Sequence, residues 1–218
     1  MADQQPEDVQ SAEREAPIRA AHQKGDYSAS ATAAVAVYGP EVLGFLIAIL
    51  KDEAVGSDVF SQFCEDLWTG LPSFRWECTF RTWAYTLARN AARRYLRSPH
   101  LKRNTQLSRD ALAEVADKVR TSTISYLRSE VKQGVQRLRE SLDEEDQALL
   151  ILRVDRNLPW NDVARIMLDE GEGEDEGAAS EASPAAIARK AAALRKRFER
   201  VKDHLRELAR QQGLLEDG

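Results

Sequence analysis

The sequence has few of the residues that mark catalytic, metal-binding or disulfide-bonded proteins. Its 218 residues include 2 cysteines and 3 histidines. Cys64 and Cys78 form neither a CxxC pair nor a disulfide framework, and Cys64 is expected in the core. His22, His100 and His204 lack metal-ligand spacing. A Gly-rich phosphate loop, a nucleophile elbow and a plausible acid–base pair of carboxylates are also missing. The sequence therefore predicts a protein that is not an enzyme and has no metal or other cofactor.

A targeting segment and a long apolar run are also missing. The chain begins Met-Ala-Asp-Gln-Gln-Pro-Glu-Asp, which contains no apolar core for a signal peptide. The most apolar run, residues 42–50, is too short to span a bilayer and is typical of a buried helix. We therefore expect a cytoplasmic protein without membrane insertion.

Acidic residues are absent between Cys78 and Arg109, although the whole chain has a net charge of −5. A solvated helix normally mixes both signs of charge, so a segment of one sign in an acidic protein suggests an anionic partner. A charge run is also typical of an ordinary solvated face. This stretch alone leaves nucleic-acid contact and a simple basic surface equally open.

Residues 79–97 within this stretch have the periodicity of a helix with one buried stripe. Thr79 is placed to cap its start, and Pro99 follows soon after its end. The apolar and small residues at three-and-four spacing are Phe80, Trp83, Ala84, Leu87, Ala88 and Ala91. Spacing of i+4 predicts a ridge of cations with an aromatic at its head, formed by Tyr85, Arg89, Arg93 and Arg97.

The remaining pattern predicts an all-α fold of two small helical domains joined by a flexible linker. A hydrophobic content of 43% is sufficient for real cores. We expect a disordered or partly helical tail over 1–28, a first domain over 29–98, a linker over 99–123, a second domain over 124–210 and a tail over 211–218.

The first domain is expected to contain a helix over 29–50, interrupted at Gly39-Pro40, and a compact helix over 58–68 capped by Ser57. Between them, residues 51–56 are typical of a turn. The polar side of the compact helix consists of Asp58, Ser61, Gln62, Glu65 and Asp66. This side is either a solvated face or a docking surface for a basic partner.

The loop over 70–78 carries two aromatic residues and an arginine: Phe74, Arg75 and Trp76. An exposed ring beside a guanidinium group can hold an unstacked base between them. The alternative is that a tryptophan in a loop covers the core.

The second domain is expected to hold a helix from Ile124 to about Leu142, a helix over 144–153 and a short helix over 160–168. Residues 169–182 contain seven carboxylates and no cation, and they are typical of a flexible acidic loop. Ser183-Pro184 then opens a second basic helix. A short helix followed by a basic helix is typical of a helix-turn-helix, whose second helix enters the major groove.

Two segments of the chain resemble the extracytoplasmic-function (ECF) class of bacterial sigma factors in the sigma-70 family. The first segment runs from Tyr38-Gly39-Pro40 through Trp68, Phe74-Arg75 and Phe80-Arg81-Thr82-Trp83 to Ala88-Arg89-Asn90, and is similar to the family's promoter-melting domain, domain 2. The second runs from Leu142-Asp143-Glu144-Glu145 through Leu158-Pro159-Trp160-Asn161-Asp162-Val163-Ala164, and is similar to the start of its upstream-element domain, domain 4.

The resemblance implies partners and roles for named residues. The partners are core RNA polymerase, promoter DNA and an anti-sigma factor. Polymerase docking maps to Asp58, Ser61, Gln62, Glu65 and Asp66. Contact with the melted −10 element maps to Arg75, Trp76, Arg81, Trp83, Arg89, Asn90, Arg93, Arg94 and Arg97. Contact with the −35 element maps to Arg189, Lys190, Arg195, Lys196 and Arg197.

Two functional hypotheses follow. The first is a factor that directs promoter recognition, DNA melting and transcription initiation. The second is a regulatory or adaptor protein on a degenerate sigma scaffold, which binds polymerase or a partner without selecting promoters. The long acidic segment within the expected helix-turn-helix favours the second hypothesis, and the match of the first domain favours the first. The acidic segment also suggests competition with DNA for the basic helix, in which case its deletion raises DNA affinity.

Overall fold

The computed structural model describes residues 6–97, 110–129, 141–168 and 183–211. Within these ranges the chain forms helices, turns and loops and no β-strand, which confirms the all-α prediction. The helices in chain order are α1 (Pro6–Gln23), α2 (Tyr27–Leu50), α3 (Glu53–Gly70), η1 (Leu71–Ser73), α4 (Phe80–Arg97), α5 (Asp110–Ser129), α7 (Glu144–Leu150), η2 (Ile151–Asp155), α8 (Trp160–Ile166) and α9 (Pro184–Gln211).

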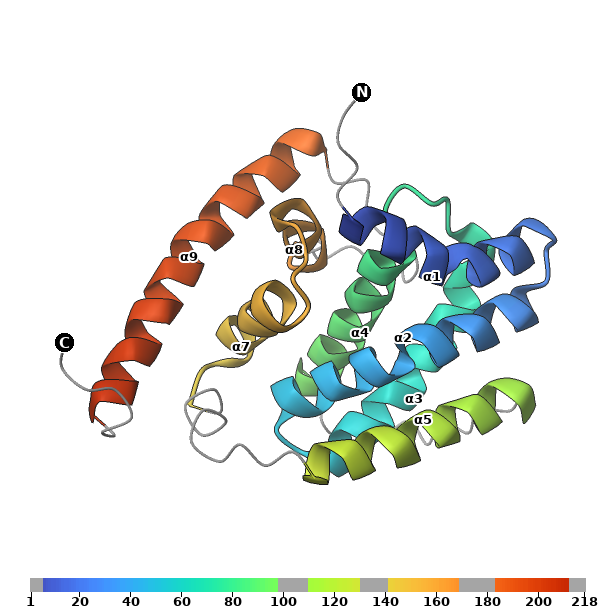
Figure 1. The fold of residues 1–218 in the computed structure, drawn as a ribbon, viewed down its shortest axis with the longest axis horizontal. Helices are drawn as coiled ribbons and strands as arrows, with labels where there is room; N and C mark the ends of the chain where they lie inside the picture. Colours follow the sequence, from blue (N-terminus) through green and yellow to red (C-terminus); the bar gives the residue numbers. More distant parts are fainter. Residues whose placement is uncertain (1–5, 98–109, 130–140, 169–182, 212–218) are drawn as a thin grey trace.

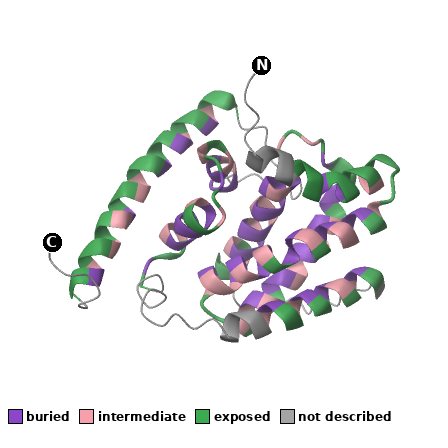
Figure 2. Ribbon diagram, viewed as in Figure 1, coloured by how far each residue is buried: buried purple, intermediate pink, exposed green. Residues whose placement is uncertain are grey.

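Helix α2 is the central element, and α1, α3, α4 and α5 pack around it (Figure 1). It is long and apolar enough to cross a membrane by length and composition, but half of its most apolar window is buried inside the bundle. The core helix of a soluble protein has the same composition. Figure 2 shows buried residues along the length of α2, as is expected of a core helix.

The expected interruption at Gly39-Pro40 is wrong, because α2 continues through Pro40 as one helix. A proline inside a helix removes one backbone hydrogen bond and costs about 3 kcal/mol. Val35 and Tyr38 before it and Val42 after it are all buried in the same core. Burying these side chains on one continuous helix offsets the cost of the proline.

The start of α3 also differs from the expected helix over 58–68. Lys51 adopts a left-handed conformation with φ of 55° and ends α2. The carboxylate of Asp52 then accepts a hydrogen bond of 2.9 Å from the backbone N–H of Val55. Asp52 therefore caps α3 five residues before the predicted cap, Ser57, which lies inside the helix.

The tail that was predicted to be disordered or partly helical and the predicted linker each contain a long helix. Helix α1 covers residues of the predicted tail, where Ile18 is fully buried against the core. Helix α5 replaces the second half of the predicted linker, and Leu112, Ala116 and Val119 are buried against α2 and α3. In both cases a few apolar side chains at helical spacing are enough, because a neighbouring surface is available to bury them.

The C-terminal helices share the core of the N-terminal bundle. Helix α8 packs on α4, and α7 packs on α2, while α9 lies along α7 and α8 (Figure 1). Apolar side chains of α8 and α9, including Val163, Ile166 and Leu194, belong to the same buried cluster as Phe80 and Tyr85 of α4. In this structure the two predicted domains therefore form one continuous core.

The local predictions for the C-terminal half are largely confirmed. The predicted helix over 144–153 is α7, capped by Asp143, followed by the π-helical turn η2. Helix α9 begins at Pro184, and the backbone N–H of Ala186 donates to Ser183 Oγ over 3.2 Å. The acidic segment 169–182 and most of the predicted helix from Ile124 to Leu142 lie outside the described residues.

Candidate nucleic-acid and polymerase interfaces

Helix α4 has the predicted boundaries. Thr79 Oγ1 accepts a hydrogen bond of 3.1 Å from the backbone N–H of Thr82, and the helix runs from Phe80 to Arg97. Trp83 is 2% exposed and stacks on Phe74 with ring centroids 4.5 Å apart. The structure therefore places Trp83 in the core, where it joins α4 to the loop before it.

The predicted cation ridge on α4 is wrong in its first half. Tyr85 is fully buried and Arg89 is 2% exposed, whereas Arg93 is half-buried and Arg97 is exposed. The i+4 spacing places these four residues on one side of α4, but α2 and α8 cover the first half of that side. Only the second half of the ridge, together with half-buried Asn90 and exposed Arg94, is turned to solvent.

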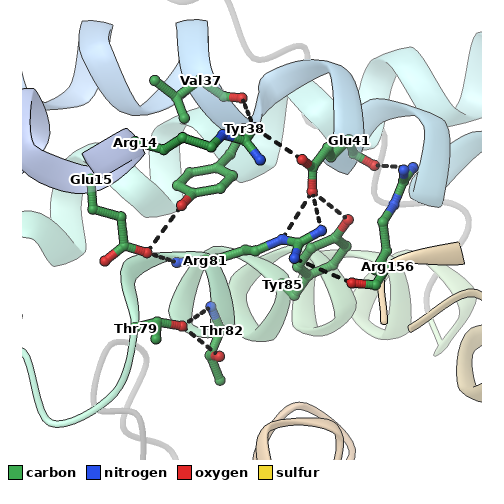
Figure 3. Close-up of polar contacts among 10 residues, drawn as sticks. All are labelled: Arg14, Glu15, Val37, Tyr38, Glu41, Thr79, Arg81, Thr82, Tyr85 and Arg156. Carbon is green, nitrogen blue, oxygen red and sulfur yellow. Dashed lines mark hydrogen bonds and ion pairs between the residues drawn. The ribbon is translucent and has the colours of Figure 1, made fainter. Parts of the chain in front are cut away.

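The carboxylate of Glu41 on α2 pairs with one arginine at the start of α4 and one on α1 (Figure 3). Glu41 Oε2 accepts hydrogen bonds from Nη2 and Nε of Arg81 at 2.8 and 3.0 Å, and Glu41 Oε1 pairs with Nη2 of Arg14 at 3.0 Å. Nη1 of Arg81 also donates to the backbone carbonyl of Arg156 over 3.2 Å. Arg81 thus links α4 to α2 and to the turn after η2.

Burial opposes ionisation of Glu41, but the Arg81 guanidinium above all, with Arg14 and Arg156, more than compensates. The pKa of Glu41 therefore lies below its ordinary value of 4.5. The hydroxyl of Tyr85 lies 3.4 Å from the same carboxylate, and burial raises the pKa of Tyr85. At neutral pH this centre consists of one anion held by cations from three segments of the chain.

Arg89 is held by the C-terminal half of the protein. Its Nη2 pairs with Oε1 of Glu145 on α7, and its Nη1 donates to the carbonyl of Ile166 at the end of α8 over 3.4 Å. A buried guanidinium group requires a compensating charge and carbonyl acceptors, and both come from residues far along the chain. In this conformation Arg89 joins the two halves and does not reach the surface.

The loop of residues 74–78 is also covered, by helix α1. The guanidinium of Arg19 lies 4.2 Å from the ring centroid of Trp76. The indole N–H of Trp76 donates to His22 Nδ1 over 3.3 Å. Arg75, predicted as the arginine beside this ring, is 73% exposed and pairs with Glu77 at 3.9 Å. The structure therefore puts a different arginine on the ring of Trp76.

The polar side of α3 is partly exposed to solvent, and two of its side chains contact neighbouring helices. Asp58 is exposed and Glu65 is half-buried. Asp66 pairs with Arg94 of α4 and accepts a hydrogen bond of 2.9 Å from Gln62. Ser61 accepts a hydrogen bond from Arg120 of α5. The five residues predicted to dock polymerase thus lie on one face of α3, bordered by α4 and α5.

Helix α9 divides into a cationic half and a balanced half. In its first half Arg189, Arg195 and Lys196 are exposed and Lys190 is half-buried. Arg197 instead pairs with Asp143 and Asp146 at the start of α7. In the second half Lys202, Arg206 and Arg210 each pair with a carboxylate three residues earlier, namely Glu199, Asp203 and Glu207. The first half therefore offers an anionic ligand the more positive surface.

The interior of the predicted helix-turn-helix is held by a tryptophan. Trp160 of α8 packs edge-on against Phe198 of α9 with ring centroids 5.6 Å apart. Arg195 of α9 and Arg153 of η2 both approach the same ring, at 5.6 and 5.3 Å. The guanidinium group of Arg195 thus lies near an aromatic ring, although the residue as a whole is exposed to solvent.

Sequence reasoning missed the residues that bind the predicted ones. Glu41 is the single carboxylate within the apolar helix 27–50, and that isolation was a signal of a buried partner. Arg19 and Glu145 lie in polar segments among several other charges, where no pattern distinguishes them. Their roles depend on tertiary contacts over 50 or more residues, such as the separation of 56 between Arg89 and Glu145.

The segment that contains α3 and α4 is similar to a known protein family. Residues 34–100, which span most of α2 and all of α3 and α4, match the family Sigma-70 region 2. The chain is also 26% identical over 139 residues to the RNA polymerase sigma-H factor of Pseudomonas aeruginosa, covering 60% of this chain and 70% of that protein. No solved structure matches the chain significantly. The matched segment contains the carboxylate-free helix α4 and the polar face of α3.

Proposed function

The chain belongs to the sigma-70 family of RNA polymerase sigma factors, and on this premise we propose that it is an initiation factor of the ECF class. It has no catalytic role of its own: it binds core polymerase in the cytoplasm, recognises a two-part promoter and melts the −10 region. The observation that carries the proposal is the region 2 match over α3 and α4, in which a polar docking face and a helix without carboxylates lie side by side.

Polymerase docks on the face of α3. Asp58 and Glu65 present carboxylates to solvent at the centre of this face, with Ser61, Gln62 and Asp66 beside them. Paired substitutions Asp58→Lys and Glu65→Lys are expected to abolish co-purification with core polymerase. Glu144→Lys, a charge reversal at an exposed carboxylate on α7, is the matched control and is expected to retain it. Retained association of the double variant would remove the docking assignment.

Promoter DNA contacts the second half of α4 and the first half of α9. Asn90, Arg93, Arg94 and Arg97 are the α4 residues at or near the surface, and they face the opened −10 strand and its phosphates. On α9, Arg189, Lys190, Arg195 and Lys196 contact the −35 element. Alanines at 185, 188 and 192 leave methyl groups between these cations, so phosphate contact dominates over base readout.

Initiation in vitro tests the proposal. Purified chain, core polymerase and genomic DNA fragments are combined, and the 5′ ends of the transcripts are sequenced. We expect new start sites that depend on the chain and share an upstream pattern. Core enzyme without the chain gives the background.

The second candidate is an adaptor on a sigma scaffold, and one observation favours it. Arg81, Trp83 and Arg89, three residues mapped to −10 DNA, are engaged in the interior. An adaptor binds polymerase in the docking assay but yields no chain-dependent start sites. The two experiments together therefore separate the candidates.

A further inference from the structure

Helix α5 packs on α2 and α3 at the edge of the bundle, and it lies after the segment that matches Sigma-70 region 2 (Figure 1). Its opposite side is charged and exposed, and there Lys118 pairs with Glu114 one turn earlier. Among the described side chains of α5, the fully buried ones form a single row with helical spacing: Leu112, Ala116, Val119 and Thr123. Helix α5 is therefore attached to the bundle along one narrow apolar row.

Val119 fixes the position of α5 along α2. A Cβ atom at Gly39 of α2 would lie 3.1 Å from both Cγ atoms of Val119 and 3.4 Å from Cζ of Phe60 on α3. Val119 thus occupies the space that a side chain at residue 39 would need. This contact gives α5 a defined seat between α2 and α3.

The end of the buried row adds little to the attachment. Thr123 is 7% exposed, and its Oγ1 has no hydrogen-bond partner among the described residues. A buried hydroxyl without a partner has lost its hydrogen bonds to water, and release of α5 from the bundle would restore them. Ala116 contributes only a methyl group. Leu112 and Val119 therefore provide most of the apolar attachment of α5.

Arg120 extends from α5 onto the polar face of α3. Its Nη2 donates a hydrogen bond to Ser61 Oγ, and its Nη1 pairs with Asp117 of its own helix. Asp58 and Glu65 lie three residues before and four residues after Ser61, on the same face of α3. A cation of this chain therefore already occupies part of the face on which a basic partner is proposed to dock.

We propose that α5 is an intramolecular strap that competes with core polymerase for the polar face of α3. In the closed state Arg120 donates to Ser61 and Val119 lies in its seat at Gly39. In the bound state a cation of polymerase replaces Arg120, because two cations at one hydroxyl repel each other, and α5 leaves its seat. The strap therefore reduces the apparent affinity for polymerase by the fraction of molecules that are open.

This inference rests on the proposed function, because it takes core polymerase as the partner of α3. A disulfide that holds the strap closed tests it. The 3.1 Å separation at Gly39 and Val119 brings two cysteines within bonding reach in the double variant Gly39→Cys/Val119→Cys. We expect the oxidised double variant to bind immobilised core polymerase at least about tenfold more weakly than the same protein after reduction. Wild type under both treatments controls for native Cys64 and Cys78 and is expected to bind equally.

A second variant removes the competing cation and leaves the apolar row unchanged. Arg120→Ala is expected to bind core polymerase about threefold to tenfold more tightly than the wild type. Lys118→Ala removes the same charge from a side chain of α5 that is 72% exposed and pairs with Glu114. This matched control is expected to stay within about twofold of the wild type.

Hydrogen exchange gives a readout that does not depend on affinity. Backbone amides of residues 112–124 are expected to exchange faster in the complex with polymerase than in the free chain, because α5 has left the bundle. Unchanged or slower exchange overturns the strap, as does equal binding of the oxidised and reduced double variant, or unchanged or weaker binding of Arg120→Ala. Failure of the proposed function is distinct from these results, since in that case the wild type itself does not bind polymerase.

Discussion

Arg89 and Glu41 are two charged residues that pair across distant parts of the chain. The guanidinium group of Arg89 is 2% exposed, and Glu145 and the carbonyl of Ile166 compensate its charge. Glu41 keeps its negative charge because Arg81 and Arg14 bind its two oxygens. Each pair joins helices that are distant in sequence. A substitution at Arg89 or Glu41 is therefore expected to weaken the packing of the helices that the pair joins.

Glu145→Gln is expected to lower the free energy of unfolding by about 2–4 kcal/mol, because it removes the carboxylate that pairs with the buried guanidinium of Arg89. Glu144→Gln changes the neighbouring exposed carboxylate and is expected to cost no more than about 0.5 kcal/mol. Urea unfolding of the wild type and both variants measures the difference. Equal effects of the two substitutions would show that Arg89 finds other partners.

Acid is expected to destabilise the wild type partly through Glu41. Because the pKa of Glu41 is below 4.5 in the folded state, this residue stabilises the fold above that pH, and its contribution is lost as the pH falls through the folded pKa. Glu41→Gln removes the contribution at every pH. Urea unfolding at about pH 6 and about pH 3.5 is expected to show a gap between wild type and variant that narrows on acidification. A constant gap would contradict the prediction.

At the scale of elements, the contact between α2 and α3 depends on a glycine. A Cβ atom at Gly56 would lie 2.7 Å from Ile47 Cγ1 and 3.0 Å from Ile47 Cα. The second contact is with the backbone of α2, which cannot rotate away. The two helices approach this closely only because residue 56 has no side chain.

Gly56→Ala is therefore expected to lower the free energy of unfolding by about 1–3 kcal/mol. Gly44→Ala is the matched control, since a Cβ there meets nothing closer than Arg156 Nη2 at 3.7 Å. In the interior of α2 this second substitution is expected to stabilise the protein by up to about 1 kcal/mol through helix propensity. Thermal unfolding followed by circular dichroism would give opposite signs for the two variants, and the same sign would refute the argument.

Element boundaries were predictable where a local signal sets them and not where packing does. Thr79 and Ser183 cap α4 and α9 as expected, because the cap depends on residues within one turn. Pro40 was expected to interrupt α2, and the burial of residues on both sides of it decided otherwise. Helix α1 was predicted only as a partly helical tail and α5 as linker, because their few apolar side chains are buried by surfaces elsewhere in the chain.

At the scale of the whole molecule, the candidate DNA surface is divided by the shared core. The sequence predicted the two basic helices, α4 and α9, which the structure contains. It did not separate the cations held in the interior, Arg81 and Arg89, from those at the surface, such as Arg97 and Lys196. That separation depends on how α7 and α8 pack against α2 and α4, which periodicity within one helix does not contain.

One cooperative unfolding transition is expected for the full chain, because Val163 and Leu194 lie in the same cluster as the side chains of α4. Tryptophan fluorescence and far-ultraviolet circular dichroism should give coincident transitions, with equal calorimetric and van't Hoff enthalpies. Two separated transitions would show that the N-terminal bundle and helices α7–α9 unfold independently.

The pairing of Arg89 with Glu145 also has a consequence for the growing chain. The two residues are 56 positions apart, and a ribosome adds roughly 5–20 residues per second, so Arg89 precedes its partner by roughly 3–11 s. During this interval α7 and α8 do not yet exist, and the side of α4 that they cover is open to solvent. The nascent protein therefore carries the Arg89 guanidinium group without Glu145, and an uncovered apolar surface on α4, until synthesis has passed residue 166.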